Sequence, residues 1–240
     1  ASLGKSYNER VTSASRVSVL SSSSEDSLGG DGAESIEITG LDPDWNPIAE
    51  VVTLASGVSV SSVQRFIRVN KAVVFAGNTN IGKIFLRRPE IDDQDSNIFN
   101  IIDIGTGITK SGFFAVRDGY TAFVTRIAGF MGAATVTERA EIVLRGWEFI
   151  SYPTKGGLIQ NQTIFIGGGT ASFEVNPLIP FAFPSRTDIT LVLRTLIGAK
   201  ITIATSLDIL LIKDGALTDI QRAEINTSSS GDVTIIPGIP

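Results

Sequence analysis

The segment closest to a ligand-binding motif is Gly77-Asn-Thr-Asn-Ile-Gly-Lys-Ile84, which follows the apolar run Ala72-Val-Val-Phe-Ala76. A strand followed by a glycine-rich loop ending in Gly-Lys is typical of P-loops, whose backbone N–H groups hold phosphate. However, Ile84 stands where Mg²⁺ binding requires a hydroxyl. Phe85-Leu-Arg-Arg-Pro89 also favours a strand ended by proline over the required helix. We therefore predict a hairpin loop here and no cofactor-binding residues.

An acidic cluster follows in the chain, formed by Glu90, Asp92, Asp93, Asp95 and Asn97. Its Asp-x-Asp-x-Asn pattern resembles the opening of an EF-hand calcium loop. The sixth and twelfth positions of that loop require Gly and Glu, and here both are Ile. We predict a solvated loop and assign no metal ligands. An irregular calcium site stays open, because oxygen ligands need no fixed motif.

Three further groups of residues invite a chemical interpretation. Asp42 and Asp44 flank a proline beside Trp45 and suggest glycoside chemistry, but Asp side chains that bond nearby amides in a turn explain the spacing better. Gly167-Gly-Gly169 lies between two strand-like runs and predicts a hairpin turn, not a phosphate loop. The larger aromatics are too few to separate a sugar-stacking platform from ordinary packing; they are Trp45, Trp147, Tyr120 and Tyr152.

The composition limits the chemistry further. The chain has 240 residues, no His and no Cys, which removes the commonest general base, the commonest metal ligand and all Ser-His or Cys-His nucleophiles. Its net charge of −5 disfavours a nucleic-acid partner, and no apolar run is long enough to span a membrane. An enzyme without His and Cys would have to rely on carboxylates, Lys, Tyr or a cofactor, and the motifs above lead us to assign no catalytic residues, no cofactor and no metal.

Short apolar–polar alternations separated by Gly, Pro, Asn and Asp run through most of the chain. In Asp188–Arg194, for example, Ile189, Leu191 and Leu193 share one predicted inner face, and Asp188, Thr190 and Arg194 the outer one. Many short strands of this kind predict an all-β fold, specifically a jelly-roll-like antiparallel β-sandwich. The expected strands are 17–20, 36–39, 48–54, 64–69, 72–76, 82–87, 98–103, 111–116, 120–127, 135–146, 162–166, 171–175, 188–194, 200–204 and 207–213.

The chain ends differ in composition from this strand-rich body. Residues 1–16 are polar and aperiodic and predict an extended N-terminal arm. The body, residues 17–213, is expected to be one sandwich or two half-domains, with a mobile Ser- and Gly-rich loop at 21–32. Residues 214–240 form a predicted C-terminal tail with a short helix candidate at 218–225.

The order of motifs resembles a known family. A Ser-rich turn and a strand lead to Gly40-Leu-Asp-x-x-Trp-Asn46, followed by a strand ending in Val52-Thr-Leu54 and another ending in Arg68-Val-Asn70. The second half continues the likeness with Val116-Arg-Asp-Gly-Tyr120, Ala140–Arg145 and Phe181–Thr190. Over residues 17–213 the chain is similar to a family of capsid decoration-like virion structural proteins of marine and cyanobacterial tailed phages.

The resemblance implies a virion component without enzymatic activity. We expect a capsid decoration or cement protein that binds the major capsid protein or other virion proteins, forms a homo-oligomer and resides in the virion after assembly in the host cytoplasm. Its position stays open between capsid surface, portal or tail, and fibre. The alternatives are a receptor- or glycan-binding module of a head or tail fibre and, least favoured, a carboxylate-based glycosidase.

Overall fold

The computed structural model describes residues 13–89, 98–110, 112–133, 139–149, 158–167, 171–197 and 201–216. All regular elements in these ranges are strands, β1 to β15, so the predicted all-β class is confirmed. The described part holds no helix that is long and apolar enough to cross a membrane. Residues 1–12 of the predicted arm, the acidic loop at 90–97 and the helix candidate at 218–225 lie outside the described residues.

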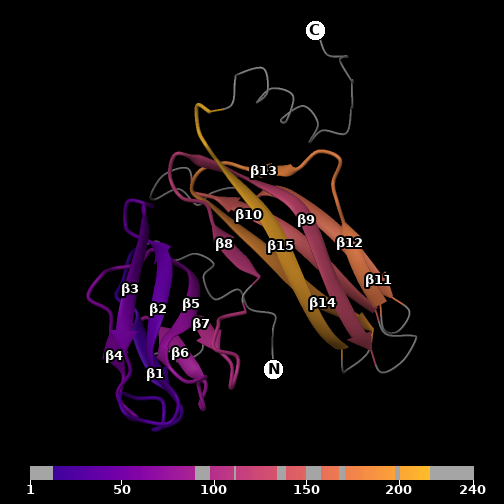
Figure 1. Cartoon of the computed structure of the whole chain (residues 1–240). Coiled ribbons are helices and arrows are strands. Elements are labelled where there is room, and N and C mark those ends of the chain that lie inside the picture. Colours follow the sequence, from indigo (N-terminus) through magenta and orange to yellow (C-terminus); the bar gives the residue numbers. More distant parts are fainter. Residues whose placement is uncertain are drawn as a thin grey trace.

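The first half of the chain forms an antiparallel sandwich, here called the N-terminal sandwich (Figure 1). One of its sheets has the strand order β4-β1-β6-β7 and the other the order β3-β2-β5. The chain crosses from one sheet to the other after β1, after β3, after β4 and after β5. The strands are β1 (Ser18–Ser21), β2 (Ala33–Leu41), β3 (Pro47–Thr53), β4 (Val60–Ser61), β5 (Arg68–Gly77), β6 (Ile84–Arg87) and β7 (Ile98–Ile102).

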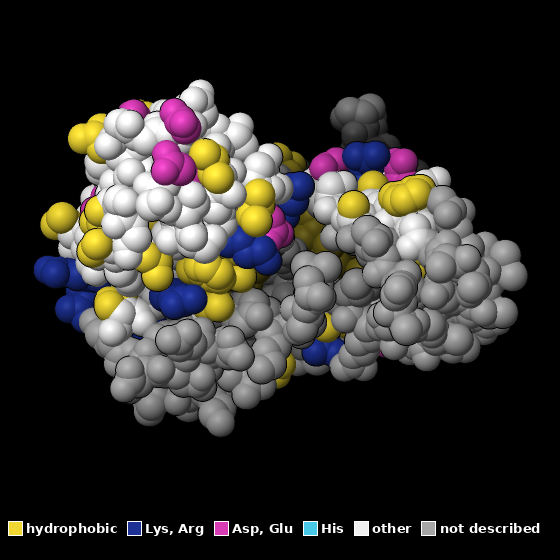
Figure 2. All heavy atoms as spheres, turned by 90° about the horizontal axis from the view of Figure 1, so that it is seen from below, with side chains coloured by type: hydrophobic (Ala, Val, Ile, Leu, Met, Phe, Trp, Pro, Cys, Tyr) yellow, Lys and Arg dark blue, Asp and Glu magenta, His cyan; other side chains and the backbone are white. Residues whose placement is uncertain are grey.

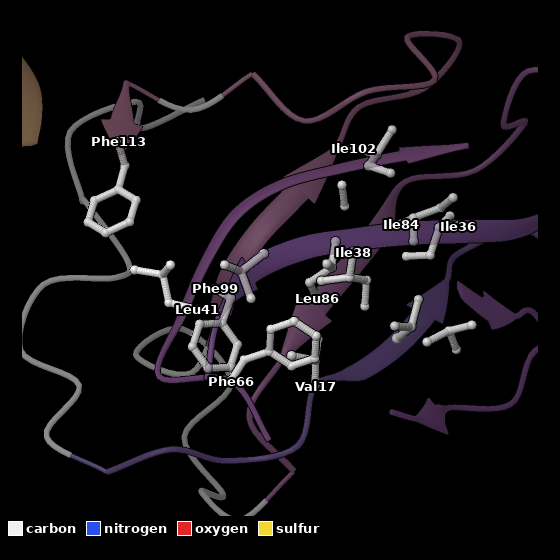
Figure 3. Packing of buried hydrophobic residues seen from close by; sticks show 14 of the residues in the cluster. Val17, Ile36, Ile38, Leu41, Phe66, Ile84, Leu86, Phe99, Ile102 and Phe113 are labelled. Atoms are coloured by element: carbon white, nitrogen blue, oxygen red, sulfur yellow. The ribbon is translucent and has the colours of Figure 1, made fainter. Parts of the chain in front are cut away.

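The core of this sandwich follows the period-2 pattern of its strands. In β2, Ile36 and Ile38 are fully buried, whereas Glu37 between them is half-buried. Successive side chains of a strand point to opposite faces, so this alternation gives β2 one inner face. The strand expected at 36–39 is confirmed as part of β2. Figure 3 shows the two isoleucines beside Ile84 and Leu86, which come from the facing sheet.

The second half of the chain forms the C-terminal sandwich (Figure 1). One sheet has the order β11-β10-β14-β8; in the other, β9 pairs with β15 along one edge and with β12 and β13 along the other. Its strands are β8 (Phe113–Ala115), β9 (Tyr120–Ala133), β10 (Arg139–Glu148), β11 (Leu158–Gly167), β12 (Ala171–Val175), β13 (Phe181–Phe183), β14 (Thr187–Ile197) and β15 (Ile201–Lys213).

Strand β9 carries a bulge that a simple alternation does not predict. Its pairing with β15 shifts between Asp208 and Ile209, which leaves Thr125 as an extra residue on β9. A bulge re-aims the side chains that follow it. Val124 and Ile127 therefore both point into the second core and are fully buried, although their spacing in the sequence is odd.

Two pairs of expected strands are in fact single strands. Of the strand expected at 64–69 only residues 68 and 69 are strand, and they form one strand, β5 (68–77), with the run expected at 72–76; its beginning and end both pair with β2. Likewise, β15 (201–213) runs without interruption through the polar pair Thr205-Ser206, because it pairs with β9 along its whole length. Continuous pairing with a long neighbour outweighs the local polarity on which the sequence boundary was based.

The predicted faces of β14 are only half right. Ile189 is fully buried and Leu191 is half-buried, while the side chain of Leu193 lies outside the described residues. Asp188 and Thr190, assigned to the solvent face, are 1% and 2% exposed. The prediction failed at Asp188 because Arg68 of the N-terminal sandwich lies against its carboxylate.

Strand β8 joins the two sandwiches. It pairs with β14 of the C-terminal sandwich, yet Phe113 and Ala115 pack into the core of the N-terminal sandwich. Phe114, on the opposite face of the strand, packs against the second core. One short strand thus contributes to both cores through its two faces.

Candidate functional site

The P-loop-like segment connects β5 to β6, and these strands belong to different sheets. The predicted hairpin is therefore wrong, because a hairpin requires that both strands pair with each other. The expected strand after the loop is confirmed as β6, Ile84–Arg87. Since a strand follows the loop, the segment lacks the helix N-terminus that supplies most of the attraction for phosphate.

The backbone donors of this loop bind a carboxylate of the chain itself. Asp26 is fully buried. Its Oδ1 accepts hydrogen bonds from the N–H groups of Ile81 at 2.8 Å and Ala33 at 3.0 Å. Its Oδ2 accepts from the N–H of Gly82 at 2.8 Å and from the hydroxyl of Ser21 at 2.6 Å. Asp26 therefore occupies the place that an anionic ligand takes in a P-loop.

The four donors also determine the ionisation of Asp26. Burial on its own raises the pKa of a carboxyl group, because it disfavours the charged form. The hydrogen bonds from Ser21, Ile81, Ala33 and Gly82 stabilise the carboxylate and outweigh burial, so the pKa of Asp26 lies below its ordinary value. Asp26 is consequently a structural anion near neutral pH.

The same contacts fix the loop between β1 and β2, which the composition predicted to be mobile. The N–H of Ser22 donates to the carbonyl of Lys83 at 2.9 Å, and the N–H of Gly32 donates to that of Glu25 at 2.9 Å. Together with the Asp26 contacts, these bonds tie residues 22–32 to the loop at 78–83. The prediction of a mobile loop is therefore corrected, since composition does not reveal a buried anchor.

Asn80 connects a third loop to these two. Its Nδ2 donates to the carbonyl oxygens of Gly82 at 2.6 Å and Asp103 at 2.9 Å, and its Oδ1 accepts from the N–H of Gly107 at 2.9 Å. The side chain is 2% exposed. A buried amide with its donors and acceptor engaged holds backbone segments in one arrangement.

These contacts predict that the loop does not bind nucleotide. Titration calorimetry of the full chain with ATP–Mg²⁺, and separately with inorganic phosphate, should show no saturable heat at micromolar ligand. Lys83→Ala should behave like the wild type, because Lys83 is half exposed and pairs with Asp103 at 3.4 Å. Micromolar ATP binding that Lys83→Ala abolishes would contradict this assignment.

The two aspartates beside Trp45 have the structural role expected from their spacing. Asp42 Oδ1 accepts hydrogen bonds from the N–H groups of Asp44 and Asn46, both at 2.8 Å. The predicted turn is thus confirmed. Trp45 has a positive φ of 66° within it and is 7% exposed, so the turn places the indole in the interior.

The remaining sequence candidates are not brought together into a site. Among the described residues no group of three or more acidic side chains is placed to hold a metal ion, and the acidic loop 90–97 lies outside them. The hairpin predicted at Gly167-Gly-Gly169 is wrong, because β11 and β12 on its two sides belong to different described sheets.

The four large aromatics do not form a platform in the described part of the chain. Trp45 packs against Phe149, with 5.6 Å between ring centroids. Tyr120 packs against the second core. The guanidinium carbon of Arg117 lies 3.5 Å from the centroid of the Tyr120 ring. Trp147 is half-buried, and Tyr152 lies outside the described residues.

A buried ion pair lies between the two sandwiches. Arg68, at the start of β5, donates from Nε to Asp188 Oδ1 at 2.8 Å and from Nη2 to Asp188 Oδ2 at 2.8 Å. Asp188 belongs to β14, and the two side chains are 0% and 1% exposed. A bidentate pair of this kind fixes orientation as well as distance.

Aromatic rings and an amide complete this junction. The guanidinium of Arg68 lies 5.1 Å from the ring centroid of Trp45 and 4.6 Å from that of Phe149. Nearby, Asn70 Oδ1 accepts from the N–H of Ala115 at 2.9 Å, and its Nδ2 donates to the carbonyl of the same residue at 3.3 Å. Cation–π contacts strengthen when the cation is removed from water, as it is here.

Sequence reasoning missed this junction. Arg68 and Asp188 are separated by 120 positions in the chain. Charged side chains in strands usually face solvent, so neither residue was expected to be buried. Arg68 and Trp45 did occur together among the motifs of the family resemblance, but nothing in their spacing indicated contact. No local pattern identifies a partner so distant in the chain.

The exposed ion pairs lie mainly on the C-terminal sandwich. Arg126 of β9 donates to Glu174 of β12 at 2.9 Å and to Asp208 of β15 at 3.4 Å. These contacts join three neighbouring strands of one sheet. The hydrogen bond from Arg126 lowers the pKa of Glu174, and that from Arg186 lowers the pKa of Asp118. Solvent screens such pairs, so they contribute little to stability.

Comparisons with known proteins give no assignment: no family model, no characterised protein and no solved structure matches the chain. The resemblance to phage virion proteins therefore stays a prediction. What the geometry adds is the role of each candidate side chain in the described residues.

Proposed function

We propose that this chain is a non-enzymatic structural protein of a phage virion, specifically a decoration or cement protein that binds the major capsid shell. It acts as an oligomer in contact with the major capsid protein or other virion proteins. The proposal includes a jelly-roll-like arrangement for the C-terminal sandwich, whose eight strands divide between two sheets.

The observation that carries the proposal is the use of the polar groups. The buried or turn-forming charged side chains described above serve architecture: Asp26 anchors loops, Asp42 forms a turn, and Arg68 with Asp188 joins the sandwiches. A component of a shell needs rigidity and broad contact surfaces. The motif order over residues 17–213 supports the same conclusion through its resemblance to virion proteins.

The test is the number of copies in purified particles of the phage that encodes the chain. We expect the protein in every particle, at a copy number comparable to that of the shell protein, and we expect reconstruction to place it on the capsid surface. Quantitative mass spectrometry against the major capsid protein gives the ratio.

Two other outcomes reject the decoration role. A few copies confined to the tail or vertices would favour the receptor- or glycan-binding module. Absence from washed particles would overturn a virion role altogether. A protein with known copy number in the same particles serves as the internal standard.

A further inference from the structure

We infer that one end of the N-terminal sandwich, the crossover end, is a docking surface for a virion protein that offers an apolar hollow rimmed by Lys and Arg. The crossover end consists of the loops 22–32, 54–59, 78–83 and 103–107. This inference rests on the proposed function and identifies which part of the chain makes the contact.

The topology brings the four loops together. Ser21 pairs with Ile84, which pairs in turn with Ile102. The loops that begin or end at these residues therefore lie at the same end of the first sheet. In the second sheet, Ala33 pairs with Gly77 at the same end, and the N–H of Leu54, where the loop 54–59 begins, donates to the carbonyl of Glu34 at 2.8 Å. The N–H of Asn78 donates to the carbonyl of Gly32 at 2.9 Å, which ties the loops of the two sheets together.

Each of these loops presents one aliphatic side chain to solvent. These four side chains are not among the buried residues of the core, and exposed apolar groups at one end of a domain can mark a contact surface. Figure 2 views the molecule from below and shows, on the N-terminal sandwich, yellow side chains among white, acidic and basic ones. The four are Leu28 (73% exposed), Val58 (61%), Ile81 (45%) and Ile104 (61%).

The loops are held in place before any partner arrives. The N–H of Ile81 itself donates to Asp26, and the N–H of Gly105, next to Ile104, donates to the carbonyl of Asn80 at 2.9 Å. A surface that is already ordered loses little conformational entropy on binding. Rigid loops with exposed aliphatic tips are therefore suited to a fixed contact in a shell.

The charges of the crossover end select the partner. Glu25 and Asp31 are exposed, and the Asp103 side chain is 61% exposed. The single base on these loops, Lys83, is paired with Asp103. The apolar tips thus have a net acidic border, which favours an apolar hollow surrounded by basic side chains.

The experiment complements a phage that lacks this protein with tip variants and counts copies per particle. We expect the double variant Leu28→Asp/Ile104→Asp to lower occupancy at least tenfold. Glu25→Lys/Asp31→Lys should lower it severalfold, with a weaker salt dependence of binding to isolated shells. The matched control is Leu178→Asp, which changes a fully exposed leucine on the C-terminal sandwich and should leave occupancy unchanged.

The outcomes separate this inference from the proposed function. Normal occupancy of the folded tip variants, with wild type present, would overturn the docking surface and leave the virion role intact. Absence of the wild type from particles would overturn the virion role. Variants that lose self-association in solution but keep normal occupancy would show that the surface binds a second copy, against the partner inferred here. Circular dichroism and melting curves establish that each variant is folded.

Discussion

Replacement of Arg68 by Ala should lower the free energy of unfolding by about 3–5 kcal/mol, because it leaves the Asp188 carboxylate buried without its bidentate partner. The loss also removes the cation between Trp45 and Phe149. Urea unfolding followed by tryptophan fluorescence measures the change, since Trp45 lies at the junction. Lys83→Ala is the control: its exposed ion pair should contribute at most about 1 kcal/mol.

The double variant Arg68→Met/Asp188→Leu distinguishes two roles of the pair. With both charges removed, no buried charge is left uncompensated, so most of the lost stability should return. We expect the relative orientation of the sandwiches to become less defined even so, because the apolar pair has no bidentate geometry. Small-angle scattering should show a broader distribution of interatomic distances than in the wild type.

Two results would contradict this account of the junction. If Arg68→Ala were as stable as Lys83→Ala, the pair would not be buried in solution. If the double variant kept both the stability and the scattering profile of the wild type, packing by β8 alone would orient the sandwiches. In that case Phe113 and Ala115, which reach into the first core, would carry the orientation.

The fold class followed from local pattern, whereas the connections did not. Alternation identified Ile189 as inward-facing and 36–39 as a strand, because the side chains of a strand repeat every two residues. The turn at Asp42 followed from short-range chemistry. Hairpins were nevertheless expected at 77–84 and 167–169, where the chain crosses between sheets. A glycine-rich turn allows the chain to reverse but does not specify which strand it joins next.

The candidate site illustrates the same limit. Sequence correctly indicated that the glycine-rich loop is no ordinary P-loop, because Ile84 replaces the required hydroxyl and a strand follows. It gave no sign that Asp26 fills the loop, since the two are separated by 55 positions. Asp26 lay within a Ser- and Gly-rich stretch whose composition indicated mobility. One buried carboxylate was enough to reverse that expectation.

Asp26 should therefore be the most sensitive position of the crossover end. Asp26→Ala leaves the N–H groups of Ile81, Gly82 and Ala33 buried without their acceptor. Each unsatisfied buried donor costs about 1–3 kcal/mol, and partial relaxation of the loops limits the expected total to about 3–4 kcal/mol. Asp26→Asn keeps one acceptor and should lose about 2 kcal/mol. Asp31→Asn, on an exposed residue of the same loop, should change stability by less than about 0.5 kcal/mol.

The stability that Asp26 contributes should also depend on pH with a defined sign. Its pKa in the folded chain lies below the ordinary value of about 3.9, so the unfolded chain binds more protons over this range. The contribution is fully present above that ordinary value and is lost as pH falls through the lower, folded pKa. Asp26→Asn has no carboxyl group to titrate, so its stability should decline less steeply than that of the wild type as pH falls below about 4.

Denaturant unfolding at several pH values in this range measures both slopes, with Asp31→Asn again as the control. Hydrogen exchange at Ile81 and Gly82 adds a local readout, because their N–H groups should exchange faster once Asp26 is protonated or replaced. Parallel acid curves for the wild type and Asp26→Asn would show that another carboxylate governs the acid response. Unchanged exchange at these two amides in Asp26→Ala would show that the loops do not depend on this anchor.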